Sequence, residues 1–233
     1  MIRLLLVRHG ETDWNKKGLF QGQSDIELNT YGLEQVRMVG QRLSTEEISS
    51  VYSSDLKRAK QTTQAITSIN GNQGLPVTYT RQLRELYFGD FEGKNFEEIK
   101  EHYLPLAKAW RDGDLDTTAP GGETLSQLGT RIMALADGIY DQHTDETVLV
   151  VAHGGPLQLM MCYLIGIDIQ HWWRFHLDTA SISIVNLYKE WSVLSLMNGT
   201  AHLATCSRKD CNDLQHTKKP RSIIESEVEG ETN

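Results

Sequence analysis

Short apolar runs alternate with longer amphipathic segments along the chain. A continuous apolar run of four to eight residues is typical of a buried strand. By this criterion we expect strands at residues 2–7, 48–52, 76–80, 147–151, 181–187 and 192–197, of which 76–80 is the weakest. The runs are short, and polar or glycine-containing segments separate them.

Apolar residues spaced by three and four positions predict the helices between these strands. We expect helices over about 31–44, from Leu56 to Ile66, within 95–112 as one or two short helices, from Leu125 to Ile139 and from Pro156 to Leu164. The strongest period begins after Thr124, which has the spacing of a capping box with Gln127. Residues 115–122 contain a Pro-Gly-Gly breaker and are expected to form a loop.

The alternation of strands and helices predicts an α/β fold. We expect a three-layer α/β/α sandwich, in which helices cover both faces of a mostly parallel central sheet. One domain is expected over residues 1–203. Residues 204–233 are polar and lack a sustained period, so we expect a flexible tail there. Cys206 and Cys211 of this tail do not have the spacing of common zinc sites, and we expect them to be ordinary thiols.

The composition excludes several classes of protein. The chain has 233 residues, and 23 Lys+Arg against 31 Asp+Glu give a net charge of −8. Nucleic acids and anionic membranes select basic surfaces, so neither is an expected partner. No apolar run reaches the length of a membrane span, and the run at 2–7 is too short for the core of a signal peptide. We therefore expect a cytoplasmic protein.

Reactive side chains follow four of the predicted strands. Arg8 and His9 follow the first strand, and Arg58 lies one turn into the helix after the second. Glu85 follows the third strand, and His153 follows the fourth. Ligands of open parallel sheets bind beyond the carboxyl ends of the strands. We therefore expect these five side chains to converge at one edge of the sheet.

Such a set is suited to phosphoryl transfer. An arginine presents a planar fork that matches phosphate oxygens, and a neutral imidazole is a competent nucleophile toward phosphorus. Glu85 is the candidate for protonating the leaving alkoxide. Gly10 and Gly154, each next to a histidine, let backbone N–H groups approach an anion.

Each of these residues also has an ordinary structural interpretation. A histidine at a strand end often only packs in the core, and an arginine or a glutamate is most often a solvated charge. For any one residue taken alone, we favour that interpretation. Together, however, it requires independent coincidences at four strand ends, so we favour an active site.

The same residues lie in four segments that follow a family pattern. The segments are 8–15 (RHGETDWN), 53–62 (SSDLKRAKQT), 83–93 (LRELYFGDFEG) and 152–155 (AHGG). In this order they resemble the motifs of the histidine phosphatase superfamily, in its phosphoglycerate-mutase-like branch. The resemblance covers residues 1–203 and implies the phosphoglycerate-mutase-like fold.

The resemblance implies a role for each of the five side chains. His9 would carry the transient phosphoryl group. Arg8, Arg58 and His153 would hold the phosphoryl oxygens. Glu85 would be the general acid and later the base for water. No metal and no other cofactor is expected, because guanidinium and imidazole groups supply the positive charge.

The resemblance also implies residues on the substrate side of the site. Asn15, Gln21, Gly22 and Gly154 would contact the phosphate or the rest of the substrate. The glycine-centred segment at 21–23 has a second interpretation as an ordinary turn. The expected ligand is a small-molecule phosphomonoester, and a homodimer is compatible with the sequence.

Hydrolysis is favoured over mutase activity. A mutase must hold a second acidic group while the phosphoryl group moves. In mutases of this family the acid lies in a sequence similar to Asn-Glu-Arg, and a long insertion carries further arginines. Here Leu86 stands where that arginine would be, and Arg111 is the only arginine between Gly93 and Pro120. The sequence therefore lacks the arginines that would bind a second anionic group.

Residues 87–92 and 120–124 resemble the α-ribazole-5′-phosphate phosphatases of cobalamin nucleotide-loop assembly. We expect this activity. The alternatives are a broad-specificity sugar or glycerate phosphatase, a cofactor-dependent phosphoglycerate mutase and a non-catalytic phosphate-binding scaffold. Aromatic residues expected at the substrate mouth, where they could stack on a benzimidazole base, are Phe20, Tyr87, Phe88, Phe91, Tyr103 and Trp110. For any one of them, packing in the core or the cap is the commoner role.

Overall fold

A single mixed sheet forms the centre of the protein. The computed structural model describes residues 1–69, 74–204 and 206. The strands are β1 (Ile2–Arg8), β2 (Ile48–Ser54), β3 (Val77–Thr80), β4 (Thr147–Ala152), β5 (Ile182–Leu187) and β6 (Ser192–Gly199). Their order in the sheet is β3-β2-β4-β1-β5-β6. The first four strands of this order are parallel, and β5 pairs antiparallel with both β1 and β6. The mostly parallel sheet is confirmed.

Helices connect the strands. They are α1 (Asp13–Lys17), α2 (Thr30–Arg42), α3 (Lys57–Ile69), α4 (Phe96–Arg111), α5 (Leu125–Gln142) and α6 (Gly154–Leu164), with short 3-10 helices η1 (Arg81–Leu83), η2 (Gly89–Phe91), η3 (Ile169–Arg174) and η4 (Ala201–Leu203). Helix α4 is one helix of 16 residues with Pro105 inside it, so the alternative of two short helices is wrong. The sequence analysis missed α1 and the 3-10 helices, which are too short to show a helical period.

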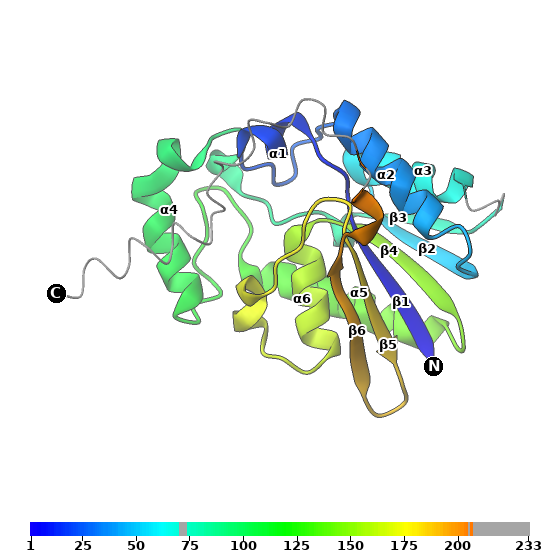
Figure 1. The fold of residues 1–233 in the computed structure, drawn as a ribbon. Coiled ribbons are helices and arrows are strands. Elements are labelled where there is room, and N and C mark those ends of the chain that lie inside the picture. Colours follow the sequence, from blue (N-terminus) through cyan, green and yellow to red (C-terminus); the bar gives the residue numbers. More distant parts are fainter. Residues whose placement is uncertain (70–73, 205, 207–233) are drawn as a thin grey trace.

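Two hydrophobic clusters lie on opposite faces of the sheet. Helices α2 and α3 cover one face, and α5 and α6 cover the other (Figure 1). Strand β1 serves both, because successive side chains of a strand point to opposite faces. Leu4 and Leu6 pack in the cluster of α5 and α6, whereas Leu5 and Val7 pack in that of α2 and α3. The predicted three-layer sandwich is confirmed.

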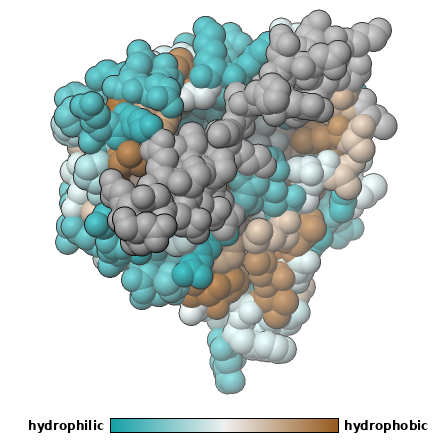
Figure 2. Space-filling view, turned by 60° about the vertical axis from the view of Figure 1, so that its left-hand side comes forward, coloured by the Kyte–Doolittle hydropathy of each residue, from teal (hydrophilic) through white to brown (hydrophobic). Residues whose placement is uncertain are grey.

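Helix α4 lies beyond the end of the sheet, on the side of α1 (Figure 1). Asn95 caps its first turn in a capping box with Glu98. Its buried residues, among them Tyr103 and Trp110, belong to the cluster that also contains α5 and α6. Hydrophilic residues predominate in the left-hand part of the coloured surface in Figure 2, and hydrophobic residues gather in its lower part and at the right. Helix α4 thus extends the core away from the sheet rather than covering one of its faces.

Two further expectations concern the ends of the chain and its helices. In the described ranges no helix is long and apolar enough to cross a membrane. The tail expected over 204–233 lies outside the described residues, apart from Ala204 and Cys206. Cys206 is buried, and Cys211 lies outside the described residues. The prediction of a flexible tail is therefore untested.

The packing of α5 gives a stability prediction. Ile132 is fully buried under this helix, whereas Thr130 on the same helix is exposed. Truncating a buried isoleucine removes apolar contacts and leaves a cavity, so we expect Ile132→Ala to lower the free energy of unfolding by about 2–5 kcal/mol. Thr130→Ala, the control, should change it by less than about 0.5 kcal/mol. Urea denaturation measures both, and equal effects would contradict the assigned packing.

Candidate active site

The carboxyl ends of three neighbouring strands bring two histidines together. Strands β2, β4 and β1 are adjacent, and Arg8 of β1 pairs in register with Ala152 of β4. His9 and His153 come directly after these two residues. The backbone N–H of His9 donates to the carbonyl of Ala152 over 3.0 Å. The centroids of the two imidazole rings are consequently 5.0 Å apart.

The hydrogen bonding of His9 defines its tautomer. Its Nδ1 lies 2.7 Å from the carbonyl oxygen of Gly10. Because a carbonyl only accepts, Nδ1 carries the proton and Nε2 keeps its lone pair. Burial lowers the pKa of His9 well below its usual value of 6.5, and the positive charges of Arg58 and Arg8 lower it further. His9 is thus neutral at physiological pH, with one nitrogen available to an electrophile.

Arg58, in the first turn of α3, is a buried cation. Only 1% of its surface is exposed. Its Nη1 and Nη2 donate to the carbonyls of Ser24 and Gly22, each over 2.7 Å, and its Nε donates to Nδ1 of His153 over 3.1 Å. Burial lowers the pKa of Arg58 to about 10, which still leaves it protonated at pH 7. Arg58 therefore places a permanent positive charge beside both histidines.

His153 is the N-cap residue of α6, and both of its ring nitrogens are engaged. Nδ1 accepts from Arg58, so Nε2 carries the proton and donates to Ser54 Oγ over 2.8 Å. Burial lowers the pKa of His153 well below 6.5, and the charge of Arg58 is the next cause. A phosphoryl oxygen that accepts from Nε2 would take the place of Ser54.

Arg8 ends β1 at the rim of the cluster. Its Nη1 donates to the carbonyl of Leu177 over 2.5 Å. Its Nε is buried, and among the described residues it has no hydrogen-bond partner. Burial lowers the pKa of Arg8, while the charges of Glu85 and Asp178 raise it. A buried donor without a partner at a site of this kind is suited to an anionic ligand.

Glu85 presents its carboxylate to the start of α6. Oε1 accepts from the backbone N–H groups of Leu86, over 2.9 Å, and of Gly155, over 3.2 Å. A Cβ atom on Gly155 would lie 2.5 Å from Glu85 Oε1, so this position requires glycine for the close approach. Gly154 lies between the two charged groups, since a Cβ there would be 3.7 Å from Glu85 Oε2 and 3.9 Å from Arg8 Cζ.

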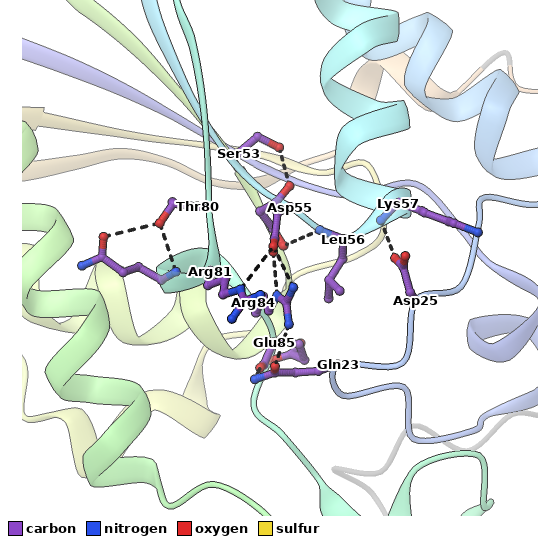
Figure 3. Close-up of polar contacts among 12 residues, drawn as sticks. Gln23, Asp25, Ser53, Asp55, Leu56, Lys57, Thr80, Arg81, Arg84 and Glu85 are labelled. Atoms are coloured by element: carbon purple, nitrogen blue, oxygen red, sulfur yellow. Dashed lines mark hydrogen bonds and ion pairs between the residues drawn. The ribbon is translucent and has the colours of Figure 1, made fainter.

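A polar network ties the end of β2 to the segment that carries Glu85 (Figure 3). Arg84 donates to both oxygens of Asp55 over 2.6 and 2.7 Å, and these hydrogen bonds lower the pKa of Asp55. Gln23 Nε2 donates to the backbone carbonyl of Glu85 over 3.2 Å. The rings of His9 and His153 lie 5.0 Å apart, Arg58 donates to His153, and Glu85 and Arg8 both lie within 4 Å of a Cβ placed on Gly154. The five side chains predicted from the sequence thus come together, as expected from the strand assignment.

The loop before α2 supplies the backbone carbonyls that bind Arg58, and other contacts hold this loop in place. Glu92 accepts from the backbone N–H groups of Gln23 and Ser24 over 2.7 and 2.9 Å. Gly22 has a φ of +50°, and a Cβ there would lie 1.8 Å from Glu92 Oε1. Gln21 is buried and accepts from a threonine hydroxyl over 2.9 Å. Gln21 and Gly22 thus shape the loop, and their predicted contact with substrate stays a prediction.

A cavity of about 460 Å³ opens next to the cluster. It reaches the charged side chains of Arg8 and Glu85, and Gly154 and Asn15 also line it. The aromatic side chains in its wall are Phe20, Phe88, Tyr103, Trp110, Trp172, Trp173 and Phe175. Two aromatic residues expected at the mouth are placed elsewhere. Phe91 is buried in the core and Tyr87 is 42% exposed, so neither lines the cavity.

One wall of this cavity was not predicted from the sequence. Trp172, Trp173, Phe175 and His176 line it from the segment that includes η3. The signal was present as a dense aromatic run shortly after the AHGG motif. This run alone did not predict a cavity wall, because the sequence does not show that the segment folds back over the strand ends. Ser54 and Glu92, which contact His153 and the loop of Arg58, were also missed as supporting residues.

The side chains near the cluster do not form a metal site. Within residues 1–69, 74–204 and 206, no group of three or more His, Cys, Asp or Glu side chains is arranged to hold a metal ion. The positive charge at the strand ends comes from the guanidinium groups of Arg8 and Arg58.

Comparison with known proteins places this site in a family. The sequence pattern of the histidine phosphatase superfamily (branch 1) matches residues 4–200. Phosphoserine phosphatase 1 of Hydrogenobacter thermophilus is 32% identical over 203 residues, which are 87% of this chain and 95% of that protein. A probable phosphoglycerate mutase GpmB of Serratia proteamaculans is 34% identical over 190 residues, or 80% of this chain and 85% of that one.

A solved structure agrees with this assignment. The α-ribazole phosphatase of Shigella flexneri superposes with a TM-score of 0.76 at 27% identity, over 85% of this chain and 97% of that chain. The matched range 4–200 includes all four segments with the family pattern and all five side chains of the cluster. The chain therefore belongs to the histidine phosphatase superfamily, as one of its phosphomonoester hydrolases.

Proposed function

We propose that the protein hydrolyses its phosphomonoester through a phosphohistidine intermediate on His9. The observation that carries this proposal is the lone pair on Nε2 of a neutral imidazole, which has no hydrogen-bond partner among the described residues and lies near the buried Arg58 and the half-buried Arg8. Arg8, Arg58 and His153 hold the phosphoryl oxygens. In phosphoryl transfer the protein contributes mainly position and charge stabilisation, and this cluster offers both.

In the first step, Nε2 of His9 attacks phosphorus and the ester P–O bond breaks. Glu85, in its protonated form, gives its proton to the departing alkoxide, so the alcohol leaves neutral. The charge on the transferring group is stabilised by the guanidinium groups. The helix N-terminus at Gly155, which touches Glu85, keeps the carboxyl group next to the leaving oxygen.

In the second step, water attacks the phosphorus of phosphohistidine. Glu85, now a carboxylate, accepts the proton of that water, and the P–N bond breaks. Inorganic phosphate leaves, and His9 regains its lone pair while Glu85 regains its proton. The cycle balances with water as the sole co-reactant, so residues of this chain supply every proton transfer.

The leaving group is the finer part of the proposal. A cavity of about 460 Å³ with a wall of aromatic rings accommodates a bulky, flat, apolar group better than a small acid. We propose α-ribazole-5′-phosphate as the substrate, in which a benzimidazole base would stack on this wall. The likeness to the α-ribazole phosphatase of Shigella flexneri supports this choice.

A small phosphorylated acid is the second candidate. Arg111 of α4 lines the same cavity, and an arginine there would pair with a carboxylate of the substrate. The likeness to phosphoserine phosphatase 1 of Hydrogenobacter thermophilus supports this reading. Phosphoglycerate mutase activity is less favoured, because Leu86 lines the cavity beside the acid where family mutases carry an arginine.

Substrate preference tests the two candidates. We expect kcat/KM for α-ribazole-5′-phosphate to exceed that for phosphoserine, 3-phosphoglycerate, fructose-2,6-bisphosphate and p-nitrophenyl phosphate at least a hundredfold, about 2.7 kcal/mol of transition-state discrimination. Phosphate release in excess EDTA measures it. Arg111→Met should leave α-ribazole-5′-phosphate hydrolysis within twofold.

The outcome for the second candidate is distinct. If phosphoserine leads and Arg111→Met removes that lead, the small-acid candidate is correct and the α-ribazole proposal is wrong. A flat profile would indicate a broad-specificity phosphatase. Lys189→Met is the control, since Lys189 lies in the β5–β6 turn at the opposite end of the sheet from the cluster.

The covalent intermediate is tested by rapid acid-free quenching with a labelled phosphomonoester. We expect base-stable, acid-labile label on His9, because among the described residues Nε2 of His9 has no hydrogen-bond partner, whereas both ring nitrogens of His153 are engaged. His9→Ala should carry no label. His153→Gln is the matched control and should still be labelled, at a lower rate. Label on His153 in the unaltered protein would contradict the assignment.

The lowered pKa of His9 predicts the pH profile. The unprotonated form persists as the pH falls past 6.5, so protonation of His9 should reduce kcat/KM only well below that value. Arg58→Gln removes a charge that lowers this pKa, and should move the acid limb to higher pH. It should also reduce the rate by on the order of 10²–10³. Both pH profiles are measured with the same substrate, so ionisation of the substrate does not contribute to the difference between them. An unshifted limb in the variant would contradict this origin of the pKa.

A further inference from the structure

An arginine outside the reacting cluster binds the backbone that carries Glu85, in addition to Gln23. Residues 82–83 end η1 and residues 84–85 follow it. None of the four lies in a strand of the described structure, so their carbonyls need other donors. Arg131 of α5 donates to three of these carbonyls. Its Nη1 donates to the carbonyls of Gln82 and Arg84 over 2.5 and 2.7 Å. Its Nη2 donates to the carbonyl of Glu85 over 3.0 Å.

The remaining donors of Arg131 bind a carboxylate. Nε and Nη2 donate to the two oxygens of Glu123 over 2.7 and 2.8 Å. All five N–H groups of the guanidinium are therefore used, three on carbonyls and two on Glu123. The side chains of the pair are only 17% and 14% exposed. Glu123 is also bound to Tyr87: its backbone N–H donates to the Tyr87 carbonyl over 2.8 Å, and its Oε2 accepts from the Tyr87 N–H over 3.3 Å.

This arrangement needs the shape of arginine. A guanidinium is planar and directs five donors along fixed directions, whereas a lysine ammonium has three donors on one atom. Lysine at position 131 would keep the charge beside Glu123 but could not reach three carbonyls at once. The anchor itself is rigid, because Leu128 and Ile132, on either side of Arg131, are fully buried in the core.

We propose that Arg131 is a positioning residue that fixes Glu85 for proton transfer to the leaving group. The carboxylate of Glu85 must meet Leu86 N–H and Gly155 N–H at its present place, and the backbone at Glu85 determines that place. Arg131 binds the carbonyls of the two peptide units that flank the Cα of Glu85, those of Arg84 and Glu85. The inference rests on the proposed role of Glu85 as the general acid.

The test compares two leaving groups. A glycerol phosphate releases an alkoxide that needs a proton, whereas p-nitrophenyl phosphate releases a stable phenolate that does not. Because kcat/KM reports the steps up to departure of the leaving group, we expect Arg131→Lys to lower it about 10–100-fold for 2-glycerophosphate, since small misplacements of catalytic groups cost up to about 10². For p-nitrophenyl phosphate the loss should be under threefold.

Controls separate positioning from folding. Both substrates are assayed on one preparation, so the ratio of the two losses is independent of the folded fraction. A second variant, Arg131→Met/Glu123→Gln, removes the guanidinium without leaving an unpaired carboxylate and should give the same ratio of losses as Arg131→Lys. The matched control is Arg37→Lys, which alters the bidentate pair of Arg37 with Glu34 on the exposed surface of α2. It should change neither substrate.

Glu85→Gln, measured in parallel, distinguishes the two possible failures. If Glu85→Gln impairs 2-glycerophosphate selectively while Arg131→Lys lowers both substrates equally or neither, Arg131 is only structural and this inference is wrong. The proposed function then stands. If Glu85→Gln itself lowers both substrates equally, the general-acid role of Glu85 fails, and the inference about Arg131 fails with it.

Discussion

The buried guanidinium of Arg58 is the interaction on which the rest of the site depends. Taking a charge out of water is costly unless hydrogen bonds replace the lost hydration. Two loop carbonyls and Nδ1 of His153 provide that replacement. The same contact fixes the tautomer of His153, and the charge lowers the pKa of both His153 and His9. Burial and this one cation together keep both histidines neutral.

The sheet makes this burial achievable. Helix α3 starts three residues after β2 ends, so Arg58 enters the site directly beyond the end of β2, which lies between β3 and β4, and it is buried there. The loop carbonyls are in place because Glu92 binds the N–H groups of Gln23 and Ser24. Gly22 permits the close approach of that carboxylate. Core packing and loop chemistry thus converge on one side chain.

The sequence predicted the parts of the site that follow directly from strand ends. Arg8, His9 and His153 follow apolar runs, and parallel strands place their carboxyl ends together regardless of loop detail. Arg58 was predictable because it lies in the first turn after such a strand. Arg131 was not, since it lies mid-helix and its partners are backbone carbonyls, which leave no trace in side-chain patterns. The wall of Trp172 and Trp173 needed the path of the chain after α6, which periodicity does not give.

The two ends of the site come from different parts of the fold, and this separation has a consequence. The phosphate end is built on strand ends and helix starts that the core holds rigidly. The leaving-group end is built on α4 and the η3 segment, beyond the edge of the sheet. Substitutions in that wall can change which alcohol fits without disturbing Arg58 or His9. Similar proteins carry different substrate names, as the phosphoserine phosphatase and the α-ribazole phosphatase do. Specificity in this chain must therefore be sought in the aromatic wall and Arg111, rather than in the motifs that define the family.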